Sequence, residues 1–246
     1  MSKKNRLVTN RQRHCACLIH GDGYDWRYVD NLHSMIRRHI DGELKLHVFT
    51  EHDRSVPPHM IKHNLTEWPG IKGPKKSWWY KMQLFNPEHY HGDLLYFDLD
   101  VVIMQNISWM FQLSTEKFWA IKDFRYLQKD SYNSINSSVM WWNTDRYAWV
   151  WDKFNAGNIE QTIRQYPGDQ DYLNATIDYN ERRYMEAKYF QSYRWQVLDG
   201  GYDFRRRRPN LPDTGAEIAG DTSVIVFHGQ PKPHEVRDPK IRNLWC

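Results

Sequence analysis

Short apolar runs alternate with amphipathic segments along most of the chain. Nearly continuous or alternating apolar residues predict strands at 14–20, 44–49, 93–98, 117–123, 138–142 and 223–227. Apolar residues at helical spacing predict a long helix over 24–39 and shorter helices over 77–85, 145–155 and 169–175. Because strands alternate with helices, we expect an α/β fold whose sheet contains several parallel strands.

The distribution of Pro and Gly favours one domain. Residues 51–75 contain several Pro and Gly breakers and predict an irregular loop, but no linker divides the chain of 246 residues. We therefore expect a basic, flexible N-terminus over 1–13 and a single domain over 14–246. No apolar run is long enough to cross a bilayer and no signal peptide is present, so a soluble, cytoplasmic protein is expected.

The most informative segment is the apolar run that ends in Asp98-Leu99-Asp100 and continues as a second apolar run over 101–103. Side chains two residues apart on extended backbone point the same way, so the two carboxylates can converge. Two ionised carboxylates at one point repel each other unless a cation lies between them, and Mg²⁺ or Mn²⁺ prefers oxygen ligands. The alternative is a turn after a strand, with both side chains capping backbone amides.

A second informative segment is His228-Gly229-Gln230-Pro231-Lys232-Pro233, which follows the β-rich run 224–227. The imidazole of His228 could complete a metal site that Asp98 and Asp100 begin. Gly229 would let backbone approach a ligand, and Lys232 would offer an ammonium group to a phosphate. The alternative is an exposed exit loop with a solvated Lys.

Composition narrows the function only slightly. A net charge of +4, from 34 basic and 30 acidic residues, suits an anionic substrate without requiring nucleic acid. The 12 Trp and 15 Tyr can stack on bases or sugars, although most aromatic rings lie in cores. Three cysteines give no disulfide framework, and we expect Cys15 and Cys17 to be buried thiols.

Both segments occur in order with further short motifs: Asp22-Gly23-Tyr24, Tyr80-Lys81-Met82-Gln83-Leu84, the segment 135–140 and the segment 168–174. In this combination the chain resembles the GT-A-fold glycosyltransferases of the glycogenin and bacterial lipooligosaccharide galactosyltransferase group (glycosyltransferase family 8), over about residues 14–234. The chain departs from the family pattern at three points. His228 and Gly229 are adjacent, where the family has two intervening residues, and Ser138 and His234 replace a Gly and a Trp.

The resemblance implies a GT-A, Rossmann-like fold with a central mixed, mostly parallel sheet flanked by helices. It implies transfer of a hexose from UDP-glucose or UDP-galactose to an unknown hydroxyl acceptor, with retention. It implies Mn²⁺ or Mg²⁺ held by Asp98, Asp100 and His228. Residues at the meeting point of donor sugar and acceptor would be Asp169, Gln170 and Asp171. Donor contacts would come from Leu18, Ile19, His20, Tyr24, Lys81, Asp98, Leu99, Asp123, Asn136, Ser137, Gly229 and Lys232.

Several alternatives stay open. Asp171 could cap a helix, Asp123 could be a surface charge at a strand end, and Arg205 to Arg208 could be a solvated loop or a clamp on an anion. A phosphatase of the haloacid dehalogenase type also carries Asp-x-Asp after a strand, but there the strand is usually the first. A non-catalytic module that binds carbohydrate or nucleic acid is the third class of protein considered.

Overall fold

A mixed seven-stranded sheet forms the centre of the computed structural model, which describes all residues except 1–10, 70, 72–73, 199–201, 204–207 and 210–216. Its strands are β1 (Gln12–Leu18), β2 (Glu43–Thr50), β3 (Ile61–Asn64), β4 (Asp93–Phe97), β6 (Phe118–Lys122), β7 (Ile135–Asn143) and β8 (Arg182–Tyr184). They lie in the order β3-β2-β1-β4-β7-β6-β8. Only β7 runs antiparallel to its two neighbours. The predicted fold class, a mixed and mostly parallel α/β sheet, is confirmed.

A smaller sheet joins two distant parts of the sequence. It contains β5 (Val101–Ile103), β9 (Phe190–Ser192) and β12 (Val224–Val226), in the order β5-β12-β9. Strand β12 runs antiparallel to β5, and the Phe227 N–H donates to the Asp100 carbonyl over 3.0 Å. The segment after β12 is thereby placed beside the Asp98-Leu99-Asp100 turn. A further short pair is formed by β10 (Tyr202–Asp203) and β11 (Arg208–Pro209).

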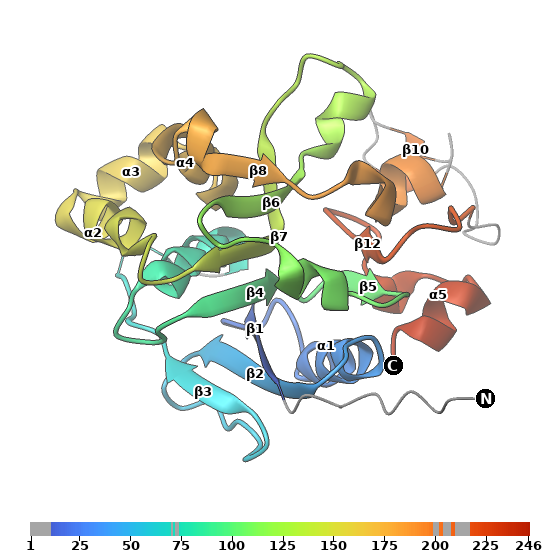
Figure 1. Ribbon diagram of the computed structural model, residues 1–246, viewed down its shortest axis with the longest axis horizontal. Helices are drawn as coiled ribbons and strands as arrows, with labels where there is room; N and C mark the ends of the chain where they lie inside the picture. Colours follow the sequence, from blue (N-terminus) through green and yellow to red (C-terminus); the bar gives the residue numbers. More distant parts are fainter. Residues whose placement is uncertain (1–10, 70, 72–73, 199–201, 204–207, 210–216) are drawn as a thin grey trace, which may run out of the picture.

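Helices cover both faces of the large sheet (Figure 1). They are α1 (Arg27–Arg38), α2 (Ala148–Ala156), α3 (Ile159–Gln165), α4 (Asp169–Thr176), α5 (Pro239–Leu244) and the long 3₁₀ segment η1 (Pro74–Phe85). Shorter turns are η2 (Ser108–Gln112), η3 (Phe124–Leu127), η4 (Tyr179–Glu181), η5 (Ala187–Tyr189), η7 (Pro233–Glu235) and the π-turn η6 (Tyr193–Val197).

Each face of the sheet has its own apolar core. One core unites the buried stripe of α1 with Cys15, Cys17 and the small sheet, and the other unites η1 with residues of α2, α3 and α4. The two cysteines are fully buried, as expected. Alternate residues of β1 and β4 feed opposite cores, because successive side chains of a strand point to opposite faces.

Several elements differ from the sequence-based expectations. Strand β3 lies inside the segment expected to be an irregular loop, and the helix expected over 77–85 is 3₁₀. Helices α3 and α5 and the short strands β8, β9, β10 and β11 were not predicted. Most of the predicted flexible N-terminus and Arg205 to Arg207 lie outside the described residues, and for Arg208 only its place in β11 is described.

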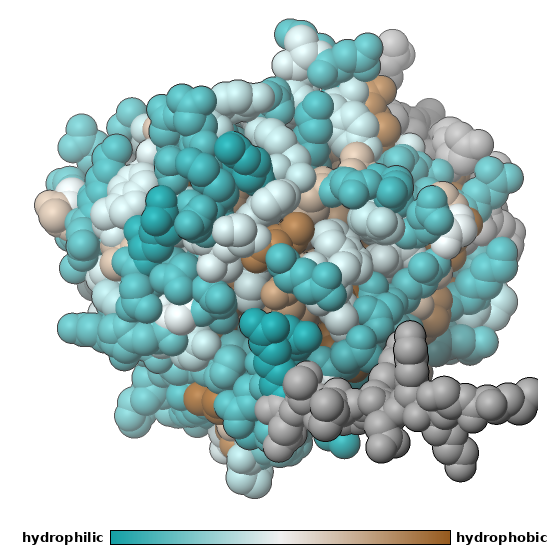
Figure 2. Space-filling model, in the orientation of Figure 1, coloured by the Kyte–Doolittle hydropathy of each residue, from teal (hydrophilic) through white to brown (hydrophobic). Residues whose placement is uncertain are grey.

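The surface drawn in Figure 2 is mainly hydrophilic, with small, separate apolar spots. This distribution agrees with apolar side chains being gathered in the two cores. None of the helices in the described residues has the length and apolar character needed to cross a membrane.

Candidate functional site

A cavity of about 430 Å³ opens where β1, β4 and β12 end. Ligand sites in α/β sheets lie beyond the carboxyl ends of strands, and this volume falls in the range of small-molecule sites. Nine of the residues predicted for the site line the cavity: Leu18, His20, Tyr24, Lys81, Asp98, Leu99, Asp100, Gly229 and Lys232. Gly23, Ser77, Trp78 and Tyr96 complete the lining.

The two carboxylates of the Asp-x-Asp triplet face this cavity from the turn between β4 and β5. Asp98 Oδ1 accepts a hydrogen bond from the Tyr96 hydroxyl at 2.7 Å and lies 2.7 Å from Lys81 Nζ. Asp100 Oδ2 accepts from the Tyr24 hydroxyl at 2.8 Å and also pairs with Lys232 Nζ. Each carboxylate thus has its own ammonium partner, which removes the repulsion expected between two neighbouring acids.

Lys81 joins this turn to the start of α4. Its side chain is buried, and its Nζ lies 2.7 Å from Asp98, 3.3 Å from Ser137 Oγ and 3.5 Å from Asp169 Oδ2. The Ser137 hydroxyl donates to Asp169 Oδ2 over 2.7 Å. Burial acts to lower the pKa of Lys81, but the carboxylates of Asp169 and Asp98 outweigh it and raise that pKa. Burial raises the pKa of Asp169, against the effect of Lys81. Lys81 therefore carries a positive charge deep in the cavity wall.

A second polar group lies behind this wall and outside the cavity lining. Gln170 donates to Asp123 Oδ2 over 2.6 Å, and the Ser137 N–H points to Gln170 Oε1 at 3.4 Å. Asp123 also caps η3 by accepting from the Arg125 N–H, so its strand-end role is partly structural. Asn136 accepts from the Ser138 N–H. Asp123, Ser137 and Gln170 are thus joined by hydrogen bonds at the start of α4, and none of the three is among the residues that line the cavity.

The acidic residues Asp98, Asp100 and Asp171 do not take the capping roles that were considered as alternatives. Gly168 occupies the N-cap position of α4, so Asp171 does not cap this helix. Among the described residues, neither Asp98 nor Asp100 accepts a side-chain hydrogen bond from a backbone amide, so the capping alternative for the Asp-x-Asp turn is not realised.

His228 does not lie with the two carboxylates. Its Nε2 is 2.6 Å from Ser192 Oγ, and its ring stacks on Phe124 with centroids 5.5 Å apart. Phe227 lies opposite Asp100 across the β5–β12 ladder, and successive residues of an extended chain point to opposite sides, so His228 turns away. Burial, together with nearby Arg194, Lys232 and Arg125, lowers the pKa of His228 to about 3.

The predicted three-residue metal set is consequently not assembled. The described part of the chain contains no group of three His, Cys, Asp or Glu side chains placed to share an ion. Asp98 and Asp100 do fit a divalent cation, because both are hard oxygen ligands on the cavity wall and the second oxygen of each accepts no hydrogen bond from the described residues. His228 does not fit in this arrangement.

The loop after β1 also differs in part from the prediction. Ile19 is buried in the core and its N–H donates to Phe49 O over 3.0 Å, so this amide is not free for a ligand. Tyr24 and His20, by contrast, line the cavity. Gly229 has φ +83°, and a Cβ there would lie 2.5 Å from Arg194 Nη1, which explains the glycine after His228.

Sequence reasoning missed Tyr96 and Trp78 as cavity residues, and Glu67 as the partner of His20. Tyr96 could have been found, since it stands two residues before Asp98 on the same strand face. Trp78 follows the predicted helix start and Glu67 lies in a segment expected to be irregular, so nothing local marks either residue.

The chain matches no protein-family model and no curated protein sequence. Its structure is similar to that of the galactosyltransferase LgtC, solved with donor and acceptor sugar analogues, at a TM-score of 0.67, 16% identity and 95% coverage of each chain. The glycosyltransferase GlyE of Streptococcus pneumoniae TIGR4 gives 0.64 at 16% identity, over 95% of this chain and 60% of that one. Mouse xyloside xylosyltransferase 1 gives 0.52 at 14% identity, over 89% of this chain and 98% of that one. The predicted resemblance to GT-A-fold glycosyltransferases is confirmed at the level of the fold.

Proposed function

We propose that this protein is a glycosyltransferase that moves a hexose from a UDP-sugar, UDP-glucose or UDP-galactose, to a hydroxyl group of an acceptor. One observation carries the proposal. Two carboxylate–ammonium pairs, Asp98 with Lys81 and Asp100 with Lys232, line a strand-end cavity of about 430 Å³ together with the aromatic residue Tyr24. A nucleoside diphosphate needs the same set of groups: cations for its phosphates and an aromatic ring for its base.

The chemistry requires stabilisation of the departing nucleoside diphosphate, whose β-phosphate gains negative charge. Lys232, at the cavity surface, exchanges Asp100 for a phosphate oxygen and supplies part of that stabilisation as a point charge. A divalent cation, Mn²⁺ or Mg²⁺, held by Asp98 and Asp100 would act as a Lewis acid on the same diphosphate. Lys81, fixed by Asp98 and Asp169, orients its ammonium group toward the donor sugar.

The acceptor is proposed to enter at the start of α4, where Asp169, Gln170 and Asp171 lie. We propose retention through front-face attack, in which the leaving phosphate and the incoming hydroxyl share one side of the sugar. A covalent route needs a free carboxylate beneath the anomeric carbon. Asp169 is bound to both Lys81 and Ser137, which favours the front-face route.

The test is a calorimetric titration with UDP, with and without Mn²⁺, on the native protein and on Asp100→Asn. We expect Mn²⁺ to strengthen UDP binding and the substitution to weaken Mn²⁺-dependent binding by roughly tenfold or more, because one of two oxygen ligands loses its charge. Asp145→Asn is the matched control, since Asp145 is a surface acid paired with His91 and lies outside the cavity. An affinity for UDP that is the same with and without Mn²⁺, and the same in Asp100→Asn as in the native protein, would contradict the proposal.

A second measurement addresses turnover. Water is itself a hydroxyl nucleophile and can take the place of a missing acceptor, so we expect slow release of UDP from the correct UDP-sugar. Release of phosphate from p-nitrophenyl phosphate, unaffected by UDP, would instead indicate a phosphatase.

A further inference from the structure

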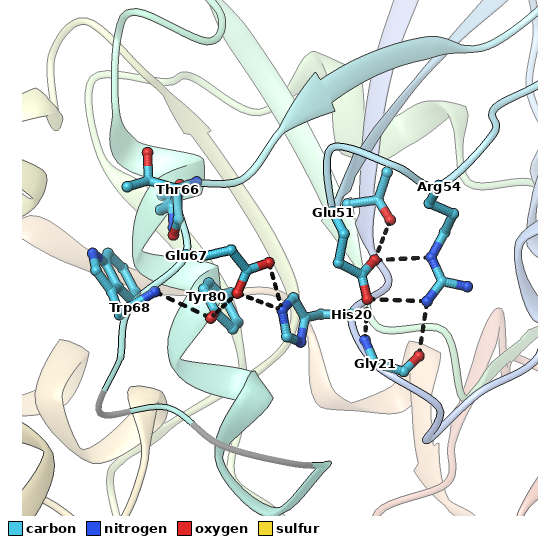
Figure 3. Close-up of polar contacts among 10 residues, drawn as sticks. His20, Gly21, Glu51, Arg54, Thr66, Glu67, Trp68 and Tyr80 are labelled. Carbon is cyan, nitrogen blue, oxygen red and sulfur yellow. Dashed lines mark hydrogen bonds and ion pairs between the residues drawn. The ribbon is translucent and has the colours of Figure 1, made fainter.

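His20 lies on the wall of the cavity in a polar group that the mechanism does not use (Figure 3). Its Nε2 is 3.0 Å and 3.2 Å from the two carboxylate oxygens of Glu67. One face of its ring stacks on Tyr80, with centroids 4.1 Å apart. The side chain is 12% exposed, so the part of the ring that remains for a ligand is small and well defined.

The partners of His20 fix its tautomer. A carboxylate that is ionised only accepts hydrogen bonds, so in the neutral imidazole Nε2 carries the hydrogen and Nδ1 keeps its lone pair. Glu67 is itself held, because the Tyr80 hydroxyl donates to its Oε2 over 2.7 Å. With Nε2 and one ring face occupied, the Nδ1 edge and the second ring face are the parts of His20 that a ligand in the cavity can use.

The backbone beside His20 is fixed as well. The Gly21 N–H donates to Glu51, and the Gly21 carbonyl accepts from Arg54 Nη2 over 2.9 Å (Figure 3). Burial acts to raise the pKa of Glu51, but hydrogen bonds from Arg54 and Gly21 lower it to about 2, so this clamp is ionised at neutral pH. The loop that carries His20 is therefore positioned before any ligand arrives.

We infer that His20 determines which nucleotide base the cavity accepts, a role that rests on the proposed use of a nucleoside diphosphate sugar. Its Nδ1 lone pair accepts a hydrogen bond from the imide N–H of a uracil-type base. Cytosine has a lone pair at the corresponding ring nitrogen, so it meets His20 acceptor to acceptor. A site built to hydrogen-bond one group rejects the analogue that lacks it, because its own polar atom is left unpaired.

The experiment compares UDP and CDP binding by calorimetry on the native protein, on His20→Phe and on Glu67→Ala. Phe keeps a ring to stack on Tyr80 but has no hydrogen-bond acceptor. We therefore expect the affinity for UDP to fall roughly tenfold and the ratio of the UDP affinity to the CDP affinity to approach one. In Glu67→Ala, no carboxylate keeps the hydrogen of His20 on Nε2, so the ratio of the UDP affinity to the CDP affinity should fall by about threefold. His91→Phe, at a surface histidine that also pairs with a carboxylate, should change neither value.

The outcomes separate the two proposals. A native protein that binds neither diphosphate overturns the proposed function. A native protein that prefers UDP, with His20→Phe equally selective and correctly folded by circular dichroism, overturns the role of His20 alone. Because the Glu67 side chain is 58% exposed, Glu67→Ala should leave the fold intact. If His20→Phe does not fold, an unchanged ratio of UDP to CDP affinity in Glu67→Ala overturns the role of His20 instead.

Discussion

Lys81 is the residue on which the charge balance of the cavity wall depends. It is buried with carboxylates on two sides, Asp98 at 2.7 Å and Asp169 at 3.5 Å. Replacing a whole buried ion pair can be harmless, but removing one partner leaves a buried charge without compensation. In the absence of Lys81, the buried carboxylate of Asp169 would be the charge that lacks a partner.

We therefore expect Lys81→Met to lower the free energy of unfolding by about 3–5 kcal/mol, and to abolish donor binding. Urea denaturation at neutral pH measures the first effect. Lys117→Met is a suitable control, because Lys117 and Glu181 form a similar 2.7 Å pair but are both about one-third exposed, and exposed pairs contribute about 1 kcal/mol or less. Equal losses in the two variants would show that Lys81 has no special role.

At the level of elements, three adjacent strands carry a row of hydrogen-bonded histidines. His14 Nδ1 lies 2.9 Å from His47 Nε2, and His47 Nδ1 lies 2.8 Å from His63 Nε2, across β1, β2 and β3. Both nitrogens of His47 are thus occupied by neighbouring rings. Burial and the neighbouring histidines lower the pKa of His47 to about 3, and burial with His89 lowers that of His63 to about 4. The row is neutral in the folded protein.

This row should make the fold sensitive to acid. The ordinary pKa is 6.5, so between pH 6.5 and about 4 the unfolded chain binds more protons than the folded one, and stability falls as pH falls. We expect a slope of up to about 1.4 kcal/mol per pH unit for each histidine. Urea denaturation over this pH range measures it. His47→Gln can still hydrogen-bond on both sides but does not titrate, so the slope should become shallower, whereas His91→Gln at the surface should leave it unchanged.

Strands β4 and β3 show how far local sequence predicts an element. Residues 94–97 of β4 are apolar and buried on both faces, so the strand and the acids at its end could be predicted from the pattern alone. Strand β3, with the residues Ile-Lys-His-Asn, has no such pattern and exists because β2 offers it a parallel partner. The orientation of His228 could not be predicted from local sequence either. It depends on the pairing of Phe227 with Asp100, a contact between residues far apart in sequence.

On the scale of the whole molecule, the C-terminal segment is linked to Tyr24 in the loop after β1. Arg38 of α1 donates to the Leu244 carbonyl at 2.7 Å, and the Trp245 ring packs edge-on against Tyr28 at 5.0 Å. Tyr28 in turn contacts Tyr24, whose hydroxyl binds Asp100. A change at the end of the chain can thus reach the cavity through two aromatic contacts.

Trp245→Ala tests this link. Trp245 is 8% exposed, and truncation of a buried Trp lowers the free energy of unfolding by about 3–5 kcal/mol, which should reduce Tm by roughly 6–15 °C. We also expect weaker UDP binding, because Tyr28 loses the ring that supports it. Thermal unfolding and calorimetry measure the two effects. Trp149→Ala, at a 39% exposed ring on α2, should alter neither substantially.

The order of the large sheet leaves two open edges, β3 and β8, and both are short. Strand β3 has four residues with a Lys among them, and β8 has three, two of which are Arg. Exposed edge strands are where one protein can recruit the backbone of another, and brief, cationic edges discourage that pairing. The short, positively charged edges that this strand order leaves at β3 and β8 should therefore discourage fibre-like self-association at high concentration.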